Sequence, residues 1–121
     1  MWQRAVTVSE KANGPESSET TRALSGLGTA LEGAGDYAAA EVVFRRAVAS
    51  SEKISGPDHE DTAVTLLDLG RIAEDQGKLA DAENAYVRAR DIFARKLGAD
   101  DEHTRYSDEA IENIRDAAAK E

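Results

Sequence analysis

The sequence predicts an all-α protein, a right-handed solenoid of antiparallel helix pairs with about six helices. The first observation is a repeat: Gly14, Gly56 and Gly98 lie 42 residues apart, and seven of the nine glycines follow this period. The second is that leucine and alanine recur at three- and four-residue intervals within each period, which defines one face of a helix. The third is that no segment shows the signals of a strand. A fixed period of this length is typical of stacked helical repeats.

The first predicted segments are a partial repeat over residues 1–13 and a complete repeat over residues 17–55. The partial repeat is a single helix that corresponds to the second helix of a complete repeat. Such helices are called second-type helices, and those that correspond to the first helix of a repeat are called first-type helices. In the complete repeat, three leucines on one face place the first helix at about residues 18–32, and Gly35 ends it. Asp36 is a good N-cap for the second helix, which continues almost to the end of the repeat.

The remaining segments are a second complete repeat over residues 59–97 and a terminal capping helix over residues 101–119. Gly77 separates the two helices of the repeat, just as Gly35 does one period earlier. In the terminal helix, Asp108 and Glu112 replace residues that are apolar or small in the earlier repeats, so its outer side is polar. A polar outer side is what a capping helix requires, and residues 1–121 therefore form a single array.

Two glycines occur inside predicted helices. Gly28 and Gly70 follow Leu27 and Leu69, where we expect a neighbouring helix to approach closely. Leucine at Gly70 should overpack this contact. Alanine is expected to be tolerated or stabilising, because glycine weakens a helix interior by about 1 kcal/mol.

Two motifs recur in register with the period. In the two complete repeats, the second helix carries a small, an aromatic and another small residue at fixed spacing, and the first helix carries a leucine followed by glycine: Ala40, Phe44, Ala47 and Ala82, Tyr86, Ala89, with Leu27-Gly28 and Leu69-Gly70. In these motifs the chain resembles tetratricopeptide repeat proteins, whose usual repeat has about 34 residues. The longer period is similar to the kinesin-light-chain type, whose signature is present as Arg46-Ala47, Glu52-Lys53, Gly56-Pro57-Asp58-His59 and Thr62. The resemblance implies a solenoid whose first helices line a concave groove.

Composition excludes several classes of partner. The chain has 24 acidic and 15 basic residues, a net charge of −9 and a pI near 4.7, so neither nucleic acid nor an anionic membrane surface is expected as a partner. It has no cysteine, and therefore no disulfide or thiolate site. No targeting segment or membrane-spanning run is recognisable, so a cytoplasmic protein is expected.

The sequence predicts no catalytic, metal-binding or cofactor-binding residues, and hence no enzyme. The two histidines, His59 and His103, lie among acidic residues, but neither segment has the spacing of a cation-binding loop. Acidic residues at these positions are typical of helix starts, where they meet the positive end of the helix dipole. No nucleophile, base and orienting group come together in the sequence.

The resemblance implies that outward residues of the first helices form a partner-binding surface. We expect Val64 and Leu67 to be apolar groove residues on a face that packing does not require. Arg22 and Arg71 could hold carboxylates of a partner. The complete predicted set is Arg22, Ser25, Thr29, Val64, Leu67, Asp68, Arg71, Tyr106 and Asn113.

The function predicted from these features is a protein–protein interaction module that binds a peptide or a partner helix, with an acidic-hydrophobic segment as the expected ligand. The alternative that remains open is an architectural spacer within a longer repeat protein, with no ligand of its own. Self-association through the N-terminal helix is also expected, because that helix lacks its first-type partner.

Overall fold

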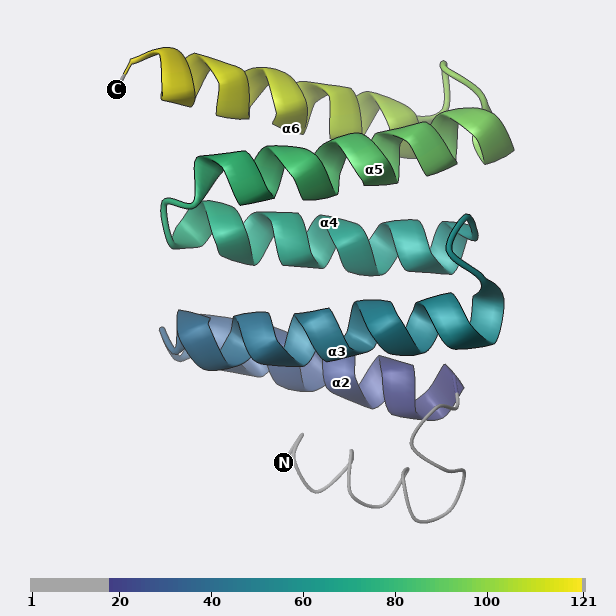
Figure 1. Ribbon diagram of the computed structural model, residues 1–121, viewed down its shortest axis with the longest axis vertical. Coiled ribbons are helices and arrows are strands. Elements are labelled where there is room, and N and C mark those ends of the chain that lie inside the picture. Colours follow the sequence, from purple (N-terminus) through teal and green to yellow (C-terminus); the bar gives the residue numbers. More distant parts are fainter. Residues whose placement is uncertain (1–17, 121) are drawn as a thin grey trace.

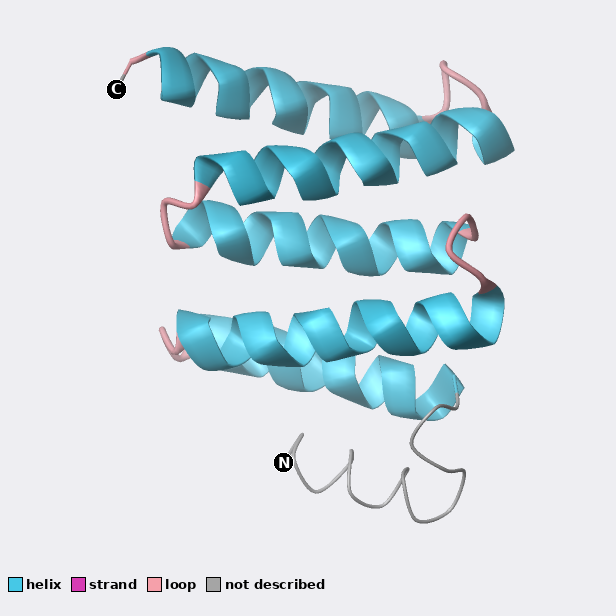
Figure 2. Cartoon of the chain, viewed as in Figure 1, coloured by secondary structure: helices cyan, strands magenta, loops and turns pink. Residues whose placement is uncertain are grey.

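The computed structural model describes residues 18–120, which form five helices joined by short loops (Figures 1 and 2). The helices stack one on the next along the long axis and alternate in direction (Figure 1). The helices predicted at about residues 18–32 and at 101–119 are present with bounds that differ by one residue, and the described range contains no strand, so the all-α solenoid is confirmed. The predicted helix in residues 1–13 lies outside the described residues. The helices are α2 (Ser18–Gly33), α3 (Tyr37–Ser55), α4 (Glu60–Asp75), α5 (Leu79–Leu97) and α6 (Glu102–Ala119).

The junctions between repeats explain why glycine and threonine share the 42-residue period. Gly56 and Gly98 follow α3 and α5 with φ angles of 103° and 96°, a region that side chains other than glycine rarely adopt. The side chains of Thr62 and Thr104 are buried, and each hydroxyl donates to the carbonyl of the glycine six residues earlier, at 2.8 Å. At each junction, a buried threonine of the helix is therefore hydrogen-bonded to the glycine of the loop before it.

Within each repeat, an aromatic ring of the second helix packs directly on a glycine of the first. Phe44 covers Gly28 and Tyr86 covers Gly70, and both rings are buried. A Cβ atom at Gly70 would lie 2.7 Å from Cε1 of Tyr86, which is too close for real atoms. This contact argues against the expectation that alanine is tolerated at Gly70, because the ring is held by its burial and by the hydrogen bond from its hydroxyl to Glu74.

Both histidines lie at helix starts, where acidic residues were predicted to gather. His59 is the N-cap of α4, and its Nδ1 accepts from the backbone N–H of Asp61 at 3.0 Å. Asp101 is the N-cap of α6, and its carboxylate accepts from the backbone N–H of His103 at 2.9 Å. The ring of His103 also packs against Phe93, with 5.0 Å between centroids. These contacts give both segments a structural role.

The last helix contributes few side chains to the core. Ile111 and Ile114 are buried against Tyr86 and its neighbours, whereas Glu112, at the position of Gly28 and Gly70, is exposed. That α6 terminates the array stays a prediction.

Candidate functional site

The predicted binding residues lie on the three first-type helices, α2, α4 and α6, at positions that repeat in register. Arg22, Val64 and Tyr106 occupy one position, 42 residues apart. Val64 and Tyr106 are large apolar side chains that are 46% and 53% exposed. Two cavities lie beside these residues, and together with the surface of α4 between them they are called the groove below.

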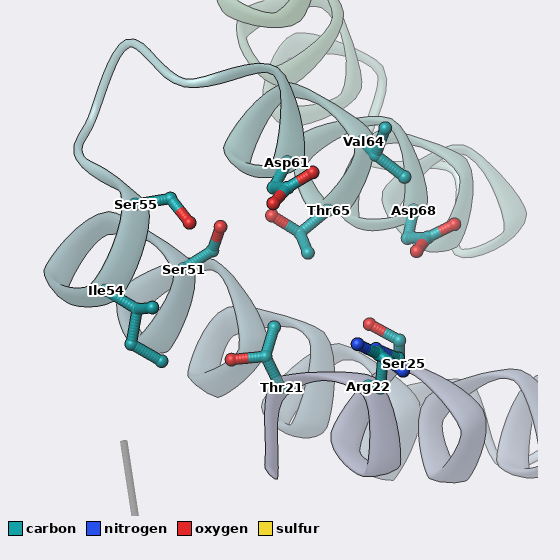
Figure 3. A pocket seen from close by; sticks show the side chains of 10 residues that line it. All are labelled: Thr21, Arg22, Ser25, Ser51, Ile54, Ser55, Asp61, Val64, Thr65 and Asp68. Atoms are coloured by element: carbon teal, nitrogen blue, oxygen red, sulfur yellow. The ribbon is translucent and has the colours of Figure 1, made fainter. Parts of the chain in front are cut away.

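The first cavity, of about 410 Å³, lies between α2, α4 and the end of α3 (Figure 3). It brings together four of the predicted residues: Arg22, Ser25, Val64 and Asp68. Its apolar part consists of Val64 and Ile54, and Ile54 is 38% exposed. Sequence reasoning missed Ile54 because it belongs to a second-type helix. The complete lining is Thr21, Arg22, Ser25, Ser51, Ile54, Ser55, Asp61, Val64, Thr65 and Asp68.

The second cavity, of about 190 Å³, lies between α4 and α6. It brings together three further predicted residues, Arg71, Tyr106 and Asn113. The other lining residues are Glu74, Tyr86, Glu109 and Ala110. Glu74 and Tyr86 were not predicted as site residues, and the hydroxyl of Tyr86 donates to Glu74 at 3.0 Å.

Two predicted residues line neither cavity. Thr29 is exposed on α2, and its hydroxyl donates to the backbone carbonyl of Ser25 at 3.0 Å. Leu67 is only half-exposed and packs against two core clusters, one around Phe93 and one around Tyr86. The expectation that packing does not require Leu67 is therefore wrong, because this side chain lies where the cores of adjacent repeats meet.

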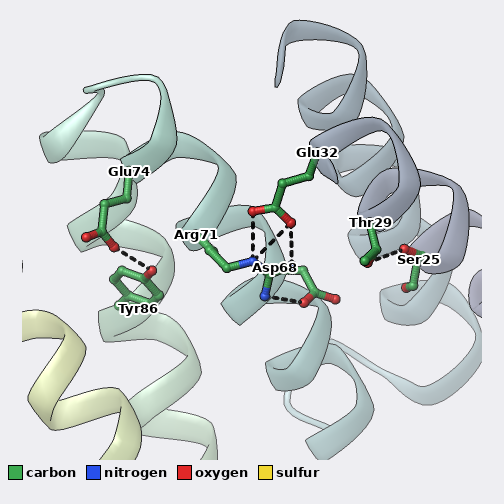
Figure 4. A network of polar contacts seen from close by, with 7 residues as sticks. All are labelled: Ser25, Thr29, Glu32, Asp68, Arg71, Glu74 and Tyr86. Atoms are coloured by element: carbon green, nitrogen blue, oxygen red, sulfur yellow. Dashed lines mark hydrogen bonds and ion pairs between the residues drawn. The ribbon is translucent and has the colours of Figure 1, made fainter. Parts of the chain in front are cut away.

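Arg71 is held by an ion-pair cluster that joins α2 to α4 (Figure 4). Its Nε donates to both carboxylate oxygens of Glu32, at 3.1 and 3.0 Å, and its Nη2 donates to Oε1 at 3.0 Å. Its Nη1 donates to Asp68 at 3.1 Å, and its guanidinium carbon lies 6.0 Å from the centre of the Phe44 ring. Asp68 lines the first cavity and Arg71 the second, so this cluster separates the two.

The pKa values of the cluster reflect crowded negative charge. The three hydrogen bonds from Arg71 lower the pKa of Glu32, whereas burial raises that of Asp68 despite its single bond to Arg71. A hydrogen bond with the Glu32 carboxylate, assisted by burial, raises the pKa of Asp75 to about 6. Ion pairing with Glu32 raises the pKa of Arg71 further above its ordinary value. The cluster thus holds more carboxylate charge than one arginine neutralises.

Arg22 differs from Arg71 in its surroundings. Its side chain is exposed at the rim of the first cavity, and it forms no ion pair with another residue of the described range (Figure 3). Of the two groove arginines, Arg22 therefore has the guanidinium that is open to an outside carboxylate.

Within residues 18–120, no group of three or more histidine, aspartate or glutamate side chains is placed to hold a metal ion. None of the described helices combines the length and apolar character needed to cross a membrane.

The chain is similar to known proteins both in sequence and in structure. Residues 1–53 and 35–95 match the family described as tetratricopeptide repeat. The solved structure of BtubC (BKLC) from P. vanneervenii aligns with 98% of this chain at a TM-score of 0.89 and 16% sequence identity. The chain spans 47% of the length of that protein. No curated protein sequence matches the chain.

Proposed function

The chain belongs to the tetratricopeptide repeat family, and we propose that it is a non-catalytic interaction module that binds a peptide or a partner helix along the groove. The helices keep the 42-residue period of the kinesin-light-chain type of repeat. Repeats of this family generally mediate protein–protein interaction. For this chain, we place the binding on the side of the solenoid that carries the groove.

The observation that supports the groove is the pairing of exposed apolar side chains with cavities. Val64 and Ile54 border the first cavity, and Tyr106 borders the second. Apolar and aromatic side chains at the edge of a concave surface are the usual anchors of an interface. A short segment that covers them should bind in roughly the micromolar range.

The acidic-hydrophobic ligand expected from the sequence depended on two free arginines. Arg71 is committed to Glu32 and Asp68, so a carboxylate of the partner would pair with Arg22 alone. We propose that Arg22 contacts one acidic group of the partner, beside an apolar side chain seated between Val64 and Ile54.

The spacer function is the second candidate, and one observation supports it. The ion pairs of Arg71 connect α2 to α4 across the groove, and such a connection fixes one repeat against the next. A spacer needs such ties and needs no free binding surface.

Peptide selection on the immobilised chain distinguishes the two candidates. A random peptide library is enriched on the full chain, and the selected peptides are then measured on Val64→Asp and on Val42→Asp. Val42 is 68% exposed on α3, outside both cavities, so it is a matched control for the same substitution. We expect Val64→Asp to weaken binding about tenfold or more, and Val42→Asp to leave it unchanged.

Two results would contradict groove binding. One is that no peptide is enriched over an empty support, which favours the spacer. The other is an equal loss for Val42→Asp and Val64→Asp, which would show that binding does not use the groove.

A further inference from the structure

The charges of the described helices are divided between the two types of helix. The first-type helices, α2, α4 and α6, contain twelve acidic and four basic residues, a net charge of −8. The second-type helices, α3 and α5, contain five acidic and seven basic residues, a net charge of +2. Because the groove is built mainly from the first-type helices, negative charge is concentrated on the side where we place the partner.

The arginine at the centre of the groove does not offset this charge. Glu32 and Asp68 together bring two carboxylates to the single guanidinium of Arg71, so the cluster remains net negative. Asp75 adds a third carboxyl, and its raised pKa has the proximity of Glu32 as its first cause. A carboxylate of the bound protein could therefore pair with Arg71 only by displacing Glu32 or Asp68.

The residues that line the two cavities also include more acidic than basic side chains. Four carboxylates line them against two arginines, and one of those arginines is Arg71. Asp61 lies at the first cavity with its side chain 72% exposed, and its carboxylate is 3.7 Å from Nδ1 of His59. Glu109 is exposed at the second cavity and has no ion pair with any residue of the described range. Arg22 is the remaining groove cation.

Between these open carboxylates lie the exposed apolar side chains. Val64 is three residues from Asp61 on α4, and Tyr106 is three residues from Glu109 on α6, so each pair shares one helix face. Tyr106 can also offer its ring face to a cation. The groove thus presents an acidic and an apolar contact at two places along its length.

We infer that the partner of this groove is a positively charged segment, with lysine or arginine placed to reach Asp61 and Glu109 and apolar residues placed to cover Val64 and Tyr106. The inference rests on the proposed function and names the chemistry of the ligand. It also limits the role of the Arg22 contact, because a segment with net negative charge would meet a repulsive surface elsewhere in the groove.

Three synthetic peptides of equal length test the inference. They share the same leucine and tryptophan positions and differ only in carrying lysine, glutamate or glutamine at the remaining sites. Each is titrated into the full, isotopically labelled chain, and amide shifts are followed by NMR. We expect the lysine peptide to bind most tightly, with shifts at residues lining the two cavities, and to weaken as salt shortens the screening length to about 8 Å or less.

Charge-removing variants distinguish the groove from general attraction to an acidic protein. Asp61→Asn and Glu109→Gln should each weaken the lysine peptide about two- to fivefold, as expected for a partly exposed charge pair. Asp100→Asn is the control, because it removes one negative charge from the loop before α6, outside both cavities. It should leave the affinity unchanged.

The outcomes separate this inference from the function on which it rests. Tighter groove binding of the glutamate peptide, or equal binding of all three, overturns the inference and leaves the interaction module standing. An equal loss for Asp100→Asn and Asp61→Asn overturns it as well, since it shows diffuse attraction. If none of the three peptides shifts a cavity residue, while peptides from the random library also fail, both proposals are wrong.

Discussion

Replacing Gly70 with alanine tests the packing contact on which each repeat depends. The substitution adds one methyl group, whose carbon would lie 2.7 to 3.1 Å from three atoms of the Tyr86 ring. The ring cannot move away freely, because its side chain is 2% exposed and its hydroxyl is bonded to Glu74. We therefore expect the helices to shift apart, or the ring to leave its rotamer.

Two opposing contributions set the magnitude. Alanine favours the helix over glycine by about 1 kcal/mol. Overpacking of a held contact costs about 1–3 kcal/mol in typical cores. The steric contribution is expected to prevail, so that Gly70→Ala lowers the free energy of unfolding by up to about 2 kcal/mol, or the melting temperature by up to roughly 10 °C.

Gly33→Ala is the matched control for this experiment. Gly33 is the last residue of α2, and a Cβ atom added there would have no neighbour within 4 Å. This variant keeps only the favourable helix contribution and should be as stable as the wild type or more stable, by up to about 1 kcal/mol.

Urea unfolding followed by circular dichroism gives the free energies for both variants. A double variant that adds Tyr86→Leu should show favourable coupling with Gly70→Ala, because the smaller side chain removes the clash. The reasoning is refuted if Gly70→Ala unfolds at the same or higher urea concentration than the wild type. It is also refuted if the double variant shows no coupling.

Three further predictions concern stability. Thr62→Val removes the hydroxyl that donates to Gly56 and should cost about 1–3 kcal/mol in urea unfolding, because the Gly56 carbonyl loses its shorter hydrogen bond and the buried hydroxyl of Ser51 loses its partner. Hydrogen bonds from Lys78 and Gln76 lower the pKa of Glu41 to about 2, so its stabilising contribution is complete above pH 4.5 and is lost as the pH falls toward 2. Glu41→Gln should therefore be less stable than the wild type at pH 7, and a constant difference down to pH 3 would contradict this account. His59→Ala should lower the free energy of unfolding by about 0.5–2 kcal/mol, because the backbone N–H of Asp61 loses its acceptor, and an unchanged stability would argue against the cap.

Helix positions could be predicted from the sequence because they depend on local signals. The glycines at 35, 56, 77 and 98 all have positive φ and mark four helix ends, and the intervals between them are filled by one apolar period each. Asp36 was predicted as an N-cap, and its carboxylate accepts from the backbone N–H of Ala39 at 3.4 Å. Such features involve residues within one turn of each other, so they can be read directly along the chain.

The candidate site was predictable only in outline. The repeat register placed Arg22, Val64 and Tyr106 at equivalent positions, but it gave no information about contacts between repeats. Arg71 and Glu32 are 39 residues apart in the sequence, and nothing local indicates that they form an ion pair. The pairing depends on how far α4 is displaced from α2, a distance that the spacing of residues along one helix does not determine.

The contacts between rings and glycines also bear on how the chain folds. Gly28 meets Phe44 and Gly70 meets Tyr86, in each case sixteen residues along the chain, and each Gly–Thr junction closes over six. Short sequence separations carry a small loop-closure entropy, and chains dominated by them have low contact order and fold quickly. A single helix pair contains its own ring contact, so either repeat can nucleate structure and extend it to its neighbour. Folding from both repeats would leave the Arg71–Glu32 pair, which bridges them, among the last contacts to form.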